Sequence, residues 1–254
     1  MSIQLPVGTR TLRVSPLMTL LTVLAVAGFG LLGRWQWHRA DEKRLQLAAF
    51  ATGSLQHIEL GNRALAQLPR FSQVQVFGHY DAAHQFLLDN ISHAGQAGYE
   101  VLTPLWLPDG RTLLVNRGWL PLRDRQRASL PDIGLDSGVA ANSESPLLQL
   151  QARVDELPST GLAAGRAPPT TDNAWPKLTS FPTTAELGTA LGRALEARQL
   201  LLAADQPAGY LRDWQPPNSG FGPERHISYA IQWWSLGLLA VALYFITNLK
   251  QAPK

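Results

Sequence analysis

LMTLLTVLAVAGFGLLG, residues 17 to 33, belongs to an uncharged stretch that runs from Val14 to Gly33. A second uncharged stretch, residues 227 to 249, lies near the other end of the chain. A helix rises ~1.5 Å per residue, so each stretch is long enough to cross a hydrocarbon core of ~30 Å. Two such stretches at opposite ends of one chain predict a membrane protein with two spans.

The first stretch also has the layout of a signal peptide, because Arg10 and Arg13 precede the apolar run. No A-x-A-like cleavage site closes it, and it continues instead into GRWQWHRADEKR, residues 33 to 44, which is compatible with a helix. We therefore expect an uncleaved transmembrane helix over residues 14–38, extended as a helix to about residue 52. The second transmembrane helix is expected at residues 225–249.

Two spans place the tails, residues 1–13 and 250–254, on the same side of the membrane. All 19 acidic residues lie between positions 34 and 225, whereas the tails carry only basic charges. The basic balance therefore comes from the membrane flanks and does not indicate a nucleic-acid surface. The basic residues on the two sides of the spans are nearly balanced, so charge alone leaves the orientation open. The chain has no cysteine, which excludes disulfides and thiolate metal sites.

Residues 53–224 have the pattern of a β-rich domain. FSQVQVFGHY and PLLQLQARVDEL alternate apolar and polar residues, as half-buried strands do. YEVLTPLWL and RTLLVNRGWLPL flank Pro108-Asp109-Gly110, which is typical of a hairpin. A short helix is expected after a cap at Thr183 or Thr184. The expected fold class is α+β, with two transmembrane helices flanking one antiparallel, barrel- or sandwich-like β domain that includes a short helix.

An enzyme has little support in the sequence. It contains no P-loop, G-x-S-x-G or H-E-x-x-H motif. His79, Asp81 and His84 are the residues from which a metal or catalytic site could be built, but their spacing matches no standard cluster. We therefore expect a protein that is not an enzyme and has no catalytic residues.

The second span opens with RHISYAIQWW, residues 225 to 234. On a helix, His226, Tyr229 and Trp233 share one face at the interfacial end of the span. A neutral imidazole beside flat aromatic rings suits haem held by one axial nitrogen, and Arg225 is placed to meet a propionate. The candidate cofactor-binding residues are Arg225, His226, Tyr229, Trp233, Trp35, Gln36 and His38, with His226 as the ligand of the haem iron.

A plainer interpretation of this segment stays open. Trp, Tyr, Arg and His gather at membrane interfaces because their rings and charged heads prefer that layer. From spacing alone, the residues indicate a two-span membrane protein with a β domain and an aromatic, histidine-bearing interface. At the end of the first span, His38 is either a second ligand or a polar neighbour.

Six segments of the chain resemble, in the same order, the Surfeit locus protein 1 family, the assembly factors of haem-copper cytochrome oxidases. They are LGRWQWHR (32–39), FGHYD (77–81), GYEVLTPL (98–105), LLVNRGWLP (113–121), DNAWPKL (172–178) and RHISYAIQWW (225–234). The resemblance extends from the first span to the second, and the combination of segments is specific where each alone is weak.

This resemblance implies a multi-pass protein of the inner membrane with cytoplasmic termini and a periplasmic β domain. It implies transient binding of haem a, with the histidine of the last helix at His226, and help with its insertion into oxidase subunit I. The implied partners are subunit I, other oxidase assembly factors including those of haem a synthesis, and membrane lipid, but no nucleic acid. The alternatives are a structural chaperone of the oxidase without haem, or a membrane-tethered enzyme using His79, Asp81 and His84.

Overall fold

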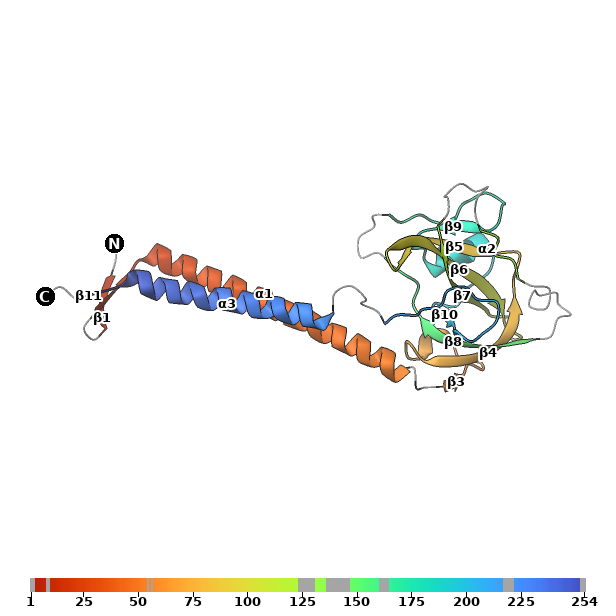
Figure 1. Ribbon diagram of the computed structural model, residues 1–254, viewed down its shortest axis with the longest axis horizontal. Coiled ribbons are helices and arrows are strands. Elements are labelled where there is room, and N and C mark those ends of the chain that lie inside the picture. Colours follow the sequence, from red (N-terminus) through yellow and green to blue (C-terminus); the bar gives the residue numbers. More distant parts are fainter. Residues whose placement is uncertain are drawn as a thin grey trace. The chain divides into compact units, whose positions relative to one another are not determined.

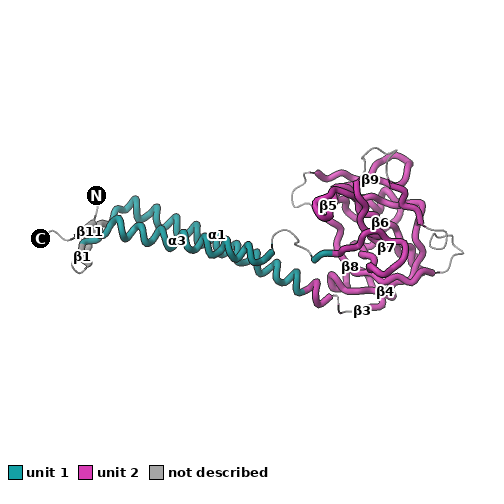
Figure 2. The backbone as a smooth tube through the Cα atoms, in the orientation of Figure 1, with its two compact units in different colours: residues 1–48, 215–254 teal, residues 49–214 magenta. Residues whose placement is uncertain are grey.

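The computed structural model describes residues 3–7, 10–53, 55, 57–122, 131–135, 147–159, 165–216 and 222–251. The chain divides into two compact units (Figure 2), one made of residues 1–48 and 215–254 and the other of residues 49–214. Within the expected β-rich domain, residues 123–130, 136–146 and 160–164 lie outside the described residues.

The first unit is built on two long helices, α1 (Pro16–Gly53) and α3 (Pro223–Asn248), which lie side by side (Figure 1). The hydroxyl oxygens of Thr19, near the start of α1, and Tyr244, near the end of α3, lie 2.7 Å apart. The helices therefore run antiparallel. Proline opens α3 in its first turn, where its missing N–H leaves no hydrogen bond unmade.

The two chain ends form a small sheet that the sequence does not predict. It contains β1 (Ile3–Val7), β2 (Arg10–Val14) and β11 (Leu249–Gln251), in the order β1-β2-β11. Both pairings are antiparallel. Segments expected to be tails are thus joined to each other by backbone hydrogen bonds.

The second unit contains one eight-stranded sheet with the strand order β3-β4-β8-β10-β7-β6-β5-β9. Its strands are β3 (His57–Glu59), β4 (Gln73–Tyr80), β5 (Phe86–His93), β6 (Gln96–Trp106), β7 (Thr112–Pro121), β8 (Leu148–Asp155), β9 (Lys177–Thr179) and β10 (Gln199–Leu202). A 3₁₀ turn, η1 (Leu65–Gln67), and helix α2 (Thr184–Leu191) complete it. The hairpin expected at Pro108-Asp109-Gly110 joins β6 to β7.

The sheet is mixed, so the expectation of a purely antiparallel domain is wrong. β3 runs parallel to β4, β9 to β5 and β10 to β7. These three short strands are not joined to their parallel partners by tight hairpins, so nothing forces the antiparallel direction that a hairpin imposes. The expected barrel is also wrong. β4 meets β6 through only two residue pairs, His79–Trp106 and Tyr80–Leu105, while β3, β5 and β9 lie beyond that contact.

The core of this unit lies around the central strand β10, whose four residues are all buried. β10 is enclosed because β7 pairs with one edge and β8 with the other. Leu200 and Leu202 pack with Tyr80, Leu105 and Leu113 in the largest apolar cluster. The alternating β4 and β8 turn their apolar residues toward this cluster, as the period of two predicts.

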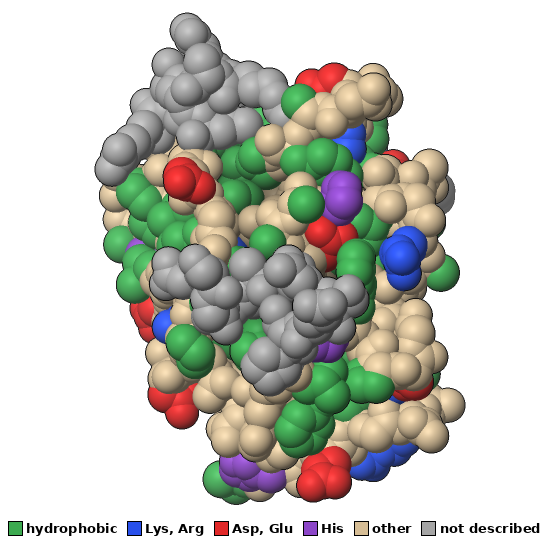
Figure 3. Space-filling view, turned by 90° about the vertical axis from the view of Figure 1, so that its right-hand side faces the viewer, with side chains coloured by type: hydrophobic (Ala, Val, Ile, Leu, Met, Phe, Trp, Pro, Cys, Tyr) green, Lys and Arg blue, Asp and Glu red, His purple; other side chains and the backbone are tan. Residues whose placement is uncertain are grey.

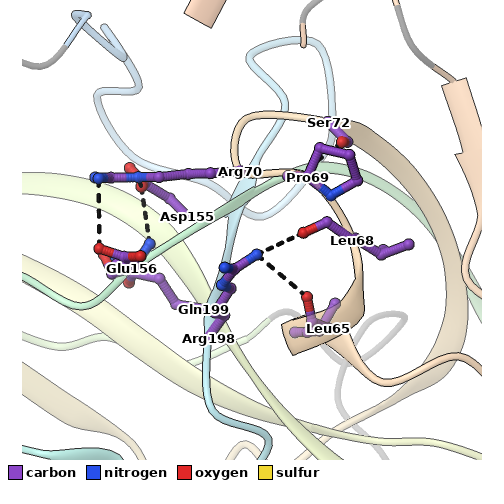
Figure 4. A network of polar contacts seen from close by, with 9 residues as sticks. All are labelled: Leu65, Leu68, Pro69, Arg70, Ser72, Asp155, Glu156, Arg198 and Gln199. Atoms are coloured by element: carbon purple, nitrogen blue, oxygen red, sulfur yellow. Dashed lines mark hydrogen bonds and ion pairs between the residues drawn. The ribbon is translucent and has the colours of Figure 1, made fainter. Parts of the chain in front are cut away.

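Two arginines fix the turn η1 and the end of β8 (Figure 4). Arg198 donates from Nη1 to the carbonyl oxygens of Leu68 at 2.6 Å and Leu65 at 3.5 Å. Arg70 Nε lies 2.5 Å from Asp155 Oδ1. The carbonyl of Leu65 also accepts from the N–H of Leu68 at 3.2 Å, whereas that of Leu68 lies past the end of the turn, where Arg198 supplies a donor.

Helix α2 begins with a capping box at Thr183. Thr183 Oγ1 accepts from the N–H of Glu186 at 3.2 Å, and Glu186 Oε2 accepts from the N–H of Thr183 at 2.8 Å. Of the two caps that the sequence left open, the structure uses Thr183, because a glutamate lies three residues after it. Gly192 ends the helix with a φ of 73°.

Glu100, in β6, has its carboxylate withdrawn from solvent beside Asn116, whose Nδ2 donates to Oε2 at 2.7 Å. Desolvation raises the pKa of Glu100 above its usual value, while the hydrogen bond from Asn116 acts in the opposite direction. A carboxyl group whose pKa is higher in the folded chain binds its proton more tightly there. Its contribution to stability is therefore present below its unfolded pKa and is lost as pH rises through the folded pKa.

In the unmodified protein, the Glu100 contribution makes the free energy of unfolding fall as pH rises above about 4.3, the usual pKa of Glu. We expect this fall to be smaller in Glu100→Gln. The oxygen of Gln still accepts from Asn116, so the hydrogen bond is kept while the titration is removed. Urea unfolding across this pH window, with the exposed Glu59→Gln as control, measures the effect. An unchanged pH slope in Glu100→Gln would contradict the prediction.

Candidate functional site

Helices α1 and α3 are long and apolar enough to cross a membrane. Only 6% of the most apolar segment of α1 and 11% of that of α3 are buried within the protein. A core helix of a soluble protein is mostly buried, so this exposure favours helices that face lipid or another membrane protein. The two helices thus indicate a membrane protein with a two-span arrangement.

Small residues let the two helices approach closely. Ala40 of α1 and Ala230 of α3 are fully buried, and Gly33 and Gly237 are buried too. A side chain at Gly33 would collide with the ring of Trp234. Small residues at a helix contact are typical of membrane helices, where close packing drives association.

Aromatic pairs flank this close contact. Phe29 and Trp233 stack with ring centroids 5.8 Å apart, and Trp37 and Trp234 stack at the same distance. Each pair joins a residue of α1 to one of α3, so the aromatic residues of both spans fix the rotation of one helix against the other.

A hydrogen bond also joins the two helices near the start of α3. His226 Nδ1, near the start of α3, lies 2.8 Å from Gln36 Oε1 on α1. An amide oxygen only accepts, so His226 carries its proton on Nδ1 in this arrangement. Nε2 is then the ring nitrogen that keeps a lone pair for a ligand.

The structure brings some of the candidate residues together and separates others. Trp233 stacks with Phe29, which lies about two turns before Gln36 on α1. Trp35 is 53% exposed, and the guanidinium of Arg39 lies 5.9 Å from the centre of its ring. Tyr229 and Arg225 are also exposed. Gln36 is therefore the candidate that contacts His226. Trp233 stacks with Phe29 instead, and the side chains of Trp35, Tyr229 and Arg225 are exposed.

His38 lies on a different side of α1 from Gln36, because residues two apart on a helix point in nearly opposite directions. It is exposed, and Arg34 Nε donates to its Nε2 at 3.4 Å. Nothing in this geometry pairs His38 with His226 as two ligands of one iron.

Phe29, Trp37 and Trp234 pack between the helices although they were not among the candidate residues. A signal for Phe29 is present, since residues 29, 33, 36 and 40 share the helical spacing of one face, as residues 226, 230, 233 and 237 do on the other helix. Trp37 and Trp234 lie outside these two series and are exposed. The exposed faces are equally apolar in a membrane helix, however, so hydrophobicity does not single out this face.

The alternative site in the β domain is only partly assembled. His84 Nδ1 lies 2.9 Å from Asp81, which also accepts from the N–H of Ala83. The His84 ring meets Trp175 edge-on, with centroids 4.9 Å apart. His79 is paired with Trp106 in the sheet. Within the described ranges, no group of three or more His, Cys, Asp or Glu residues could hold a metal ion.

The surface drawn in Figure 3 has a mixed character. Basic, acidic and histidine side chains are interspersed there with hydrophobic and neutral ones. No block of one charge stands out among the described residues on this face, so it offers no focus for a charged ligand.

Comparison with known proteins agrees with the geometry. The model of the SURF1 family matches residues 23–238, which include most of both long helices and the β domain between them in the sequence. A SURF1-like protein from Dictyostelium discoideum is 32% identical over 120 residues. That match covers 43% of this chain and 44% of the relative, so the two are similar over less than half of their lengths. The family expected from the six sequence segments is confirmed: the chain belongs to the SURF1 family.

Proposed function

We propose that this protein assists the assembly of a haem-copper cytochrome oxidase by binding haem a transiently and helping its insertion into subunit I. Membership of the SURF1 family supports the assembly role. The observation that supports haem binding is the hydrogen bond of 2.8 Å between His226 Nδ1 and Gln36 Oε1, which leaves Nε2 as the ligand nitrogen. Histidine is a common axial ligand of haem iron.

The residues around His226 fit a flat, largely apolar cofactor with a charged edge. The imidazole is partly buried between the helices, and the Trp233 ring lies two turns deeper on α3. Arg225 is exposed at the aqueous end, where a guanidinium suits a propionate carboxylate. When bound, haem a supplies the redox-active iron that the oxidase requires. The protein holds, orients and releases this group, so no catalytic residue is needed.

The proposed setting is the inner membrane, with both chain ends in the cytoplasm and the β domain in the periplasm. The pairing of β2 with β11 supports a common side for the two ends. The lipid-facing surface of α1 and α3 is largely exposed, which leaves room for a contact with subunit I or with the proteins of haem a synthesis.

His226→Ala tests this function. We expect the variant, purified in detergent from cells that make haem a, to lose its haem a absorbance. The loss in affinity should exceed the ~10–100-fold typical of changes to a residue that only holds a ligand in place, because the variant removes the ligand itself. Ser228→Ala is the matched control, since Ser228 is exposed, lies two residues away and bonds only to the Glu224 carbonyl in its own helix.

Equal absorbance in His226→Ala and the unmodified protein would place the ligand on another residue. Absence of haem from both, with oxidase assembly still dependent on the protein, would favour a structural chaperone.

A further inference from the structure

Gln36 occupies a special position on α1. It lies between Gly33 and Ala40 on the face that packs against α3, and both of these small neighbours are buried. Its side chain is partly buried and reaches His226 on the other helix. The hydrogen bond therefore joins residues 190 positions apart in the sequence at a close helix contact.

The chemistry of this bond affects the other ring nitrogen. A partner that accepts the Nδ1 proton fixes the tautomer and the ring orientation, and it makes Nε2 more basic. A carboxylate acceptor carries a full negative charge and strengthens the bond, whereas an amide oxygen is neutral. An imidazole held by an amide is thus oriented as well as one held by a carboxylate, but it donates less strongly to a metal.

We propose that Gln36 is the positioning residue of His226, and that its neutral amide keeps His226 a moderate ligand from which haem can be released. This inference rests on the proposed function and deepens it. The fold supplies orientation through a bond between the two helices. The choice of Gln at this position limits the strength of the ligand, which a transfer protein requires and a permanent haem protein does not.

Two substitutions at this position should act in opposite directions. Gln36→Leu has a similar size and accepts no hydrogen bond, so haem should bind about 10–100-fold more weakly. Gln36→Glu keeps the acceptor and adds charge, so ferric haem should bind more tightly relative to ferrous haem. For a one-electron couple, a tenfold change in this ratio lowers the reduction potential by about 59 mV.

The experiment uses the full chain in detergent, loaded with haem a in cells. A second sample, from which the haem has been removed, is titrated with ferric haem b to measure its affinity. The reduction potential of the bound haem a is measured by spectroelectrochemistry. Gln46→Glu is the matched control, because it makes the same chemical change ten residues, or ~15 Å, farther along α1. We expect the potential to fall in Gln36→Glu and to stay unchanged in Gln46→Glu.

A purely structural role for Gln36 would change the stability of the helix pair but not the potential of haem bound to it. If His226→Ala loses haem while both Gln36 variants keep the affinity and potential of the unmodified protein, the inference is wrong and the proposed function stands. If the unmodified protein binds no haem, both fail. Gln36→Leu and Gln36→Glu are expected to change haem binding in opposite directions. If one variant does not fold, the other therefore still tests the role of Gln36.

Discussion

Replacing Arg117 by Met is expected to lower the free energy of unfolding of the β domain by about 3–5 kcal/mol. Arg117 is only 2% exposed, and burial lowers its pKa below the usual value for arginine. It donates to the carbonyl oxygen of Ala208 at 2.7 Å, to that of Ile133 at 3.1 Å and to Gln85 Oε1 at 2.8 Å. Met fills part of the space but donates no hydrogen bond, and each lost bond from a charged donor costs ~1.5–3 kcal/mol. Gln85 Oε1 keeps the hydroxyl of Thr103 at 2.7 Å and the Ile133 carbonyl keeps Gln85 Nε2 at 3.0 Å, so the carbonyl of Ala208 loses most.

Urea unfolding of the detergent-solubilised chain, followed by tryptophan fluorescence, measures this loss. The control is Arg193→Met, because Arg193 is exposed and its guanidinium lies 4.8 Å from the centre of the Trp106 ring. An exposed cation–π contact contributes ~0.5–1 kcal/mol, so the control should lose no more than that. Equal losses in the two variants would show that the buried hydrogen bonds of Arg117 contribute little.

Gly118→Ala is expected to cost about 3–5 kcal/mol, for two reasons that add. Gly118 has a φ of 113°, which side-chain-bearing residues rarely adopt, at ~1–3 kcal/mol. A Cβ there would also lie 2.7 Å from the carbonyl oxygen of Leu211. That oxygen accepts from the N–H of Trp119 at 2.8 Å, so it cannot withdraw without breaking a hydrogen bond. Overpacking of this kind adds ~1–3 kcal/mol.

Gly110→Ala separates the two contributions. Gly110 has a φ of 86° but nothing lies within 4 Å of the Cβ that Ala would add, so only the conformational cost applies. The same unfolding measurement should therefore show a clearly smaller loss for Gly110→Ala. If the two variants lose the same stability, the contact with Leu211 is not what requires glycine at position 118.

Both large effects concern the same contact. Arg117 and Gly118 lie in β7, and each touches the segment from Ala208 to Leu211 that follows β10. Tyr210 N–H also donates to the carbonyl oxygen of Arg117 at 2.7 Å. β7 thus fixes the path of the chain as it leaves the β domain, which accounts for an arginine and a glycine side by side in a buried strand.

The sequence was most informative where local pattern decides the structure. The alternation in β4 and β8, the turn at Pro108-Asp109-Gly110 and the glutamate after Thr183 each act within a few residues. It failed on β9 and on the direction of β10, because a strand of three or four residues has too few positions to show a period. The pairing of such a short strand depends on which sheet edge the longer strands leave unpaired.

The candidate site was likewise predictable from the sequence only where a local pattern decides the structure. His226 was identified by its position in a motif and at the start of an apolar helix. Its partner Gln36 was named as a candidate, but the hydrogen bond between them depends on how far each helix is rotated about its axis. That rotation is set by Gly33, Ala230 and the stacked aromatic residues acting together. No single stretch of sequence contains this information.

The central place of β10 has a consequence for the order in which the protein is made. β7 ends at Pro121 and β10 begins at Gln199, so the ribosome adds about 80 residues between them, on the order of 4–16 s of synthesis. During that interval the edge of β7 that β10 later joins is open, and so is that of β8 once residue 155 has been added. Open edges pair readily with other chains. A nascent chain of this protein therefore exposes unpaired strand edges until most of its length has been synthesised.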